Sequence, residues 1–98
     1  MNSIRVAVWS YEFERPVLVE ILESDTRQAP VVVRHQSVDH EGSVSVVHRY
    51  WVEDGVVWAT YHSEGVDGEG RLVCGWTKAW EPQTESWDVR DVECNEPR

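Results

Sequence analysis

Residues 44–62 read VSVVHRYWVEDGVVWATYH and contain the clearest structural signal in the chain. Two runs rich in β-branched and aromatic residues flank Asp54-Gly55, which provides the two positive-φ positions of a type I′ turn. Such a turn closes a β-hairpin with a two-residue loop and fixes its register, in which Trp51 faces Trp58. The segment is therefore predicted to be a hairpin of residues 44–53 and 56–62.

The alternation of side chains gives this hairpin two faces, and neither is polar throughout. One face carries Val47, Arg49, Trp51, Trp58, Thr60 and His62, and the other carries Val46, His48, Tyr50, Val52, Val57, Ala59 and Tyr61. A hairpin with one solvated side shows a clean apolar–polar alternation. We therefore expect that both faces are covered, as in a sandwich or a curled barrel, or that one is an exposed aromatic binding surface.

Further β-forming segments lie on both sides of the hairpin. Strands are predicted at about residues 3–13, 17–23, 31–38 and 71–80, with one short edge strand within 81–98. The expected fold is all-β, with six to seven mostly antiparallel strands in a meander-like small barrel or sandwich. The alternative is an α+β fold with a helix near residues 16–27, because Pro16 suits the first turn of a helix.

Two glycine-containing segments predict local features. Residues 64–70 combine three glycines with acidic side chains, which predicts a flexible acidic loop. Gly75 lies inside a predicted strand, which indicates a β-bulge or a close approach of another backbone.

The length and composition bound the class of protein. The 98 residues, 41% of them hydrophobic, predict a single domain over residues 1–98 with an acidic tail at 93–98 that we expect to be frayed. No apolar run is long enough for a membrane span.

The N-terminus lacks the pattern of a secretory signal, so a cytoplasmic location is expected, in a host cell if a phage encodes the protein. Cys74 and Cys94 are too few for a disulfide framework and are expected to be free thiols.

The sequence contains no motif for catalysis, for a cofactor or for a metal. It has no G-x-S-x-G elbow, no C-x-x-C pair and no phosphate-binding glycine loop. The four histidines match no metal-ligand spacing, and His48 and His62 fall on opposite faces of the hairpin. We therefore expect a protein that is not an enzyme and that uses neither a cofactor nor a metal.

The net charge of −9 lies mostly in the second half of the chain. Residues 1–50 carry a net charge of −2 and residues 51–98 a net charge of −7. Carboxylates gathered on one side create a negative potential that attracts a basic partner and repels nucleic acid. The acidity is also what a high-salt cytoplasm or solubility alone would favour. The residues predicted to contact a partner are Glu64, Asp67, Glu69, Asp88, Asp91 and Glu93, with Trp51 or Trp58 as an apolar anchor.

These features predict a small acidic binding protein that blocks a basic, nucleic-acid-binding surface of a partner protein or ribonucleoprotein complex. In size and charge alone, such a protein resembles the anti-CRISPR and anti-restriction inhibitors of phages, which act as nucleic-acid mimics, and also immunity proteins and antitoxins. No direct contact with nucleic acid or a membrane is expected. The alternatives are an aromatic-lined barrel that recognises a peptide, a modified side chain or a sugar, and a structural homo-oligomer such as a homodimer.

Overall fold

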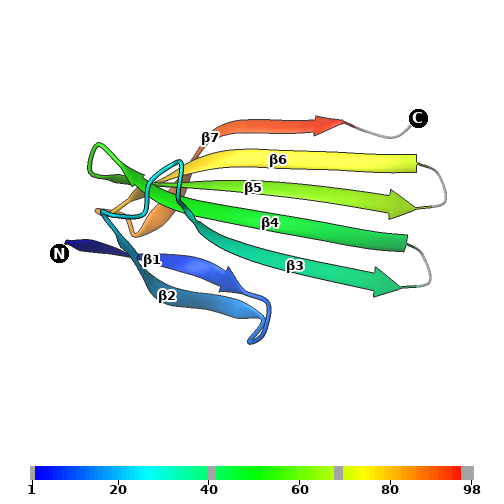
Figure 1. The fold of residues 1–98 in the computed structure, drawn as a ribbon, viewed down its shortest axis with the longest axis horizontal. Helices are drawn as coiled ribbons and strands as arrows, with labels where there is room; N and C mark the ends of the chain where they lie inside the picture. The colour runs from blue at the N-terminus through cyan, green and yellow to red at the C-terminus, as the bar shows by residue number, and fades with distance from the viewer. Residues whose placement is uncertain (1, 40–41, 68–69, 96–98) are drawn as a thin grey trace.

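The computed structural model describes residues 2–39, 42–67 and 70–95. In this part of the chain, seven antiparallel strands form two sheets and no helix occurs (Figure 1). The strands are β1 (Ser3–Ser10), β2 (Arg15–Leu22), β3 (Val31–Asp39), β4 (Gly42–Glu53), β5 (Val56–Asp67), β6 (Gly70–Glu81) and β7 (Ser86–Asn95). The first two form a hairpin, and the other five form an open meander with β3 and β7 as its edges. The predicted all-β meander is confirmed.

The β4–β5 hairpin has the register that the sequence predicts. Trp51 pairs with Trp58, and Asp54 and Gly55 have φ angles of 53° and 75°, as a type I′ turn requires. The predicted division of the hairpin into two faces follows from this register. The Asp-Gly turn was sufficient to predict this register because the loop has only two residues.

The alternative helix near residues 16–27 is wrong, because residues 15–22 form strand β2. Along β2, Val17, Val19 and Ile21 are partly or fully buried, whereas Leu18 and Glu20 are exposed. Burial with a period of two fits a strand that packs through one face. The β-branched residues of this segment therefore outweigh the helical start that Pro16 permits.

The flexible acidic loop predicted at residues 64–70 is also wrong for most of its length. Strand β5 continues to Asp67 and β6 begins at Gly70, and these two residues are themselves register partners. Residues 68–69 lie outside the described part of the chain. Residues 64–67 pair with β4 on one side and with β6 on the other, so ladder hydrogen bonds on both sides offset their weak β-propensity.

Gly75 marks a close backbone approach, one of its two predicted roles. A Cβ atom at this position would lie 3.0 Å from the carbonyl oxygen of Tyr61. The bulge lies elsewhere, where the β6–β7 register shifts between Thr77 and Lys78. Strand β7 includes residues 93–95 of the segment expected to fray, and residues 96–98 are not described.

The core lies between the β1–β2 hairpin and one face of the large sheet, which we call the inner face. Val6 and Ile21 of the hairpin pack against Tyr50, Val57, Ala59 and Trp80 of the sheet. The hairpin lies beside the end of the sheet that carries the β4–β5 turn, and β3–β6 extend past it (Figure 1). The two layers therefore form a sandwich of unequal sheets, which leaves the opposite, outer face of the large sheet without a second layer.

Cys74 of β6 and Cys94 of β7 form a disulfide, so the prediction of two free thiols is wrong. The two residues are register partners, with Cα atoms 4.1 Å apart. Two cysteines 20 positions apart carry no pairing signal in the sequence. The antiparallel arrangement of β6 and β7 is what brings them together.

Candidate binding face

Four of the six predicted acidic contact residues share the outer face. Glu93 of β7 is in register with Gly75 of β6 and His62 of β5, and Asp91 lies one row along the same face. Glu64 and Asp88 follow the same alternation. Asp88, Asp91 and Glu93 are exposed, and Glu64 is half-buried. Asp67 ends β5 but its side chain is not described, and Glu69 lies outside the described residues.

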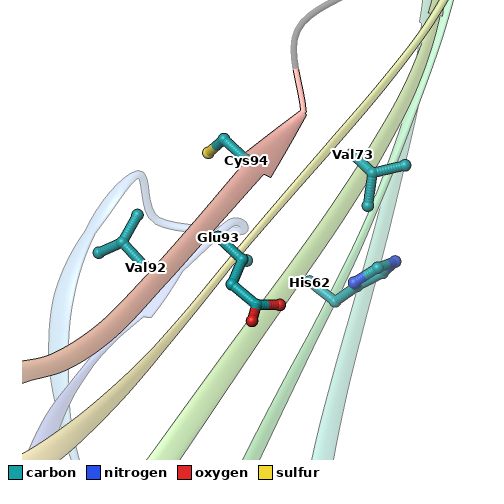
Figure 2. Close-up of a pocket in the computed structure, with 6 residues that line it drawn as sticks. His62, Val73, Val92, Glu93 and Cys94 are labelled. Carbon is teal, nitrogen blue, oxygen red and sulfur yellow. The ribbon is translucent and has the colours of Figure 1, made fainter.

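Gly75 creates a shallow hollow in the middle of this acidic region. Because glycine has no side chain, the outer face is open between His62 and Glu93. The hollow at this place, which Val73 and the edge residues Val92 and Cys94 also line, has a volume of about 600 Å³. Figure 2 shows the Glu93 carboxylate directed to the side of β7 on which His62 lies. A smaller adjoining hollow of about 220 Å³ adds Asp91, Thr60 and Thr77 to the lining. Both hollows therefore border on the Glu93 carboxylate, and the smaller one also borders on Asp91 and on hydroxyl groups.

Two of the four acidic side chains have a partner within the protein. The Glu64 carboxylate lies 3.2 Å from Nε2 of His62, and the Asp88 carboxylate lies 3.0 Å from Nε of Arg90. Within residues 2–39, 42–67 and 70–95, Asp91 and Glu93 have no ion-pair partner. The negative charge that is free to attract a partner is thus concentrated on the C-terminal half of β7.

The outer face is divided by charge across its strands. Arg34 of β3 and Arg49 of β4 are exposed on it, at the edge opposite β7. The acidic residues occupy the β5–β7 half. The two sides of the outer face therefore carry opposite charge.

The two candidate anchor residues differ in exposure. Trp51 is only 6% exposed, with the Arg27 guanidinium 5.9 Å from its ring, and the adjacent Val52 N–H donates to the Asp25 carbonyl at 2.8 Å. The segment between β2 and β3 therefore covers Trp51. Trp58 is half-buried and lies 5.8 Å from the Arg90 guanidinium. Trp58 is the accessible indole of the pair.

Sequence reasoning missed the apolar side chains that are most exposed on the β1–β2 hairpin. Trp9, Phe13 and Leu18 are 47%, 60% and 67% exposed. Trp9 and Leu18 belong to the side of the hairpin that faces away from the large sheet. The signal was present in the sequence, because the alternation in residues 3–10 places Trp9 opposite to the apolar Ile4, Val6 and Val8.

A second missed feature is the aromatic cluster around His48 on the inner face. His48 is 5% exposed and lies 5.1 and 6.2 Å, between ring centroids, from Tyr61 and Trp76. A hydrogen bond of 2.7 Å joins the Tyr11 hydroxyl to its Nε2. Burial lowers the pKa of His48, and the nearby charge of Lys78 lowers it further. This cluster connects the β1–β2 turn to the large sheet through the hydrogen bond between Tyr11 and His48.

The lowered pKa of His48 predicts a stability loss in acid. The unfolded chain binds this proton with a pKa of about 6.5, so the contribution is complete above that pH and is lost as the pH falls below it. The free energy of unfolding should fall by up to about 1.4 kcal/mol per pH unit from this residue alone. Urea unfolding at several pH values should give a shallower slope for His48→Gln than for the wild type. Equal slopes would contradict the assignment.

No protein family model, curated protein or solved structure matches the chain. No helix in the described ranges is long and apolar enough to cross a membrane. Nor do the histidine, cysteine, aspartate and glutamate side chains placed by the structure form a group of three that could hold a metal ion. The geometry of the outer face is therefore the basis for assigning a function.

Proposed function

We propose that the protein is a small acidic, non-enzymatic binding protein that blocks a basic surface of a partner protein through the β5–β7 half of its outer face. The observation that carries this proposal is the pair of exposed, unpaired carboxylates of Asp91 and Glu93 beside the hollow at Gly75. The absence of a covering layer leaves this half of the sheet open to a partner.

A lysine or arginine side chain of the partner suits this hollow. Its cationic head can reach the Glu93 and Asp91 carboxylates, and charge-assisted hydrogen bonds of this kind are the stronger class. The hydroxyl groups of Thr60 and Thr77 supply further acceptors at the lining. Trp58, on the same face, adds an apolar surface at the side of the acidic region.

The partner that we propose is a basic protein or ribonucleoprotein complex, such as one whose groove binds nucleic acid. A charge of −9 repels nucleic acid itself but is attracted to a surface that has evolved to bind phosphates. Inhibition in the manner of phage anti-CRISPR or anti-restriction proteins, in the cytoplasm, is the corresponding biological proposal. Recognition of a peptide or sugar by an aromatic surface and a role as a homo-oligomeric subunit stay predictions.

Reversal of the two free carboxylates should weaken binding to a basic target. For Asp91→Lys/Glu93→Lys we expect at least a ~10-fold increase in Kd for an immobilised arginine-rich peptide, measured by surface plasmon resonance. Two new positive charges at the contact replace attraction by repulsion. Binding of the wild type should also weaken steeply between about 50 and about 500 mM NaCl, because salt screens exposed charges.

The matched control is Glu12→Lys/Glu53→Lys, which changes the net charge equally. Glu12 lies in the β1–β2 turn and Glu53 at the β4–β5 turn, and both are exposed. This control should lose much less affinity than the double variant on β7. An equal loss would mean that only net charge matters, and an unchanged Kd for the β7 variant would exclude this face.

A further inference from the structure

Strand β7 is held to the protein in different ways along its length. Its first part is anchored by Trp87, whose indole N–H donates to the Ala7 carbonyl at 2.7 Å. The same ring lies 5.1 Å from Trp80 and 6.1 Å from Tyr50, between ring centroids. This part of β7 is therefore attached to the core and to the hairpin as well as to β6.

The C-terminal part of β7 lacks such an anchor. It follows the bulge opposite Thr77 and Lys78, is an edge segment, and pairs only with β6. Val92, which alternation places on the inner face, is 61% exposed because the β1–β2 hairpin does not cover it. Glu93 faces Gly75, which offers no side chain to pack against. The ladder hydrogen bonds and the disulfide at Cys94 are what hold this part in place.

The disulfide is accessible from solvent on one side. Cys94 is exposed and Cys74 is half-buried. Figure 2 shows the Cys94 side chain leaving β7 on the side opposite to Glu93, so that its sulfur projects from the inner face near Val92. An incoming thiol can therefore approach the Cys94 sulfur without passing the carboxylates of the outer face.

We propose that the Cys74–Cys94 disulfide is a site of exchange with a dithiol reductant, and that its reduction releases the C-terminal part of β7 from the sheet. This segment carries Asp91 and Glu93, so its release dismantles the acidic region of the outer face. The effect on binding rests on the function proposed above, whereas the exchange reaction and the release do not.

The reaction balances with a dithiol as the only co-reactant. One thiolate of the reductant attacks the Cys94 sulfur, a mixed disulfide forms, and Cys74 leaves as a thiolate that takes up a proton. The second thiol of the reductant then attacks the reductant sulfur that is bonded to Cys94, and Cys94 is released as a thiol. Two electrons and two protons pass to the protein, and the reductant ends as a disulfide.

A cytoplasmic location would give this exchange a role. Disulfides of cytosolic proteins are mostly transient and redox-sensing, because cellular dithiols keep thiols reduced. The Cys74–Cys94 disulfide connects the edge segment of β7 to β6, its only neighbouring strand, which suits a redox-sensing role. The oxidised protein would present the acidic region, and the reduced protein would not.

Hydrogen exchange of the oxidised protein and of the protein treated with dithiothreitol tests this inference. Mass spectrometry should show two free thiols after treatment. Amides of residues 91–95 should exchange at least ~10-fold faster, because the disulfide no longer opposes separation of this segment from β6. Amides of β4 and β5 should keep their protection. The Cys74→Ser/Cys94→Ser variant should match the reduced protein and should not respond to dithiothreitol.

Each outcome bears on one part of the inference. A disulfide that resists dithiothreitol in the folded protein, or unchanged exchange at residues 91–95, would overturn it. Loss of protection throughout β4 and β5 would also overturn it, because release would then be global. Local release together with no binding of the arginine-rich peptide in either redox state would refute the proposed function and leave the exchange site standing.

Discussion

Replacement of Ile21 by alanine is expected to lower the free energy of unfolding by about 3 kcal/mol. Ile21 is 1% exposed and lies with Val6 between the β1–β2 hairpin and the large sheet. Truncation removes buried apolar atoms and leaves a cavity that the paired strands around it cannot readily fill. Urea unfolding followed by tryptophan fluorescence measures the change.

Leu18→Ala is the matched control, since Leu18 lies on the same strand and is 67% exposed. Its truncation should change the free energy of unfolding by no more than about 0.5 kcal/mol. Similar losses for the two variants would contradict the packing of the hairpin through Val17, Val19 and Ile21.

Replacement of Trp87 by alanine is expected to cost about 3 kcal/mol of unfolding free energy. The indole contacts Trp80 and Tyr50, and its N–H satisfies the Ala7 carbonyl at 2.7 Å. Loss of the ring removes its contacts with β4 and β6 and leaves the Ala7 carbonyl of β1 without its donor. The measurement is again urea unfolding, followed here by circular dichroism because the variant lacks one fluorophore.

The variant Trp87→Phe separates the two contributions. It keeps an aromatic ring but removes the N–H, so its cost should be about 1 kcal/mol. A cost equal to that of the alanine variant would assign the effect to the hydrogen bond alone. No cost for the alanine variant would mean that β7 is not attached to β1 as described.

The parts of the fold that depend on local chemistry could be predicted from the sequence. Asp54-Gly55 permits one tight turn, and that turn fixes the pairing of every residue in β4 and β5. The division of the hairpin into two faces, and with it the placement of Trp58 on the face of Trp51, follows from a period of two. The same rule places Asp91 and Glu93 together once β7 is known to pair with β6.

The remaining features depend on contacts between distant segments. The disulfide requires the β6–β7 register, which includes a bulge near Thr77 that no residue in the sequence indicates. Trp51 is buried because the segment after β2 crosses it, which its own neighbours in sequence do not indicate. His48 has a side-chain hydrogen-bond partner only because the fold brings the hydroxyl of Tyr11, 37 residues away in sequence, to its ring. Residues 64–67 form a strand because a neighbouring strand pairs with them, against their own propensity.

The hydrogen bond between Trp87 and Ala7 joins positions 80 residues apart, so β1 is synthesised well before the strand that supplies its donor. The Ala7 carbonyl is therefore without this donor until β7 has been synthesised. Closing so large a loop has a high entropic cost, and topologies of this kind fold in milliseconds to seconds rather than microseconds. Before β4–β6 pair and cover it, the β1–β2 hairpin exposes Val6 and Ile21, whose buried packing partners Tyr50, Val57, Ala59 and Trp80 lie on those three strands.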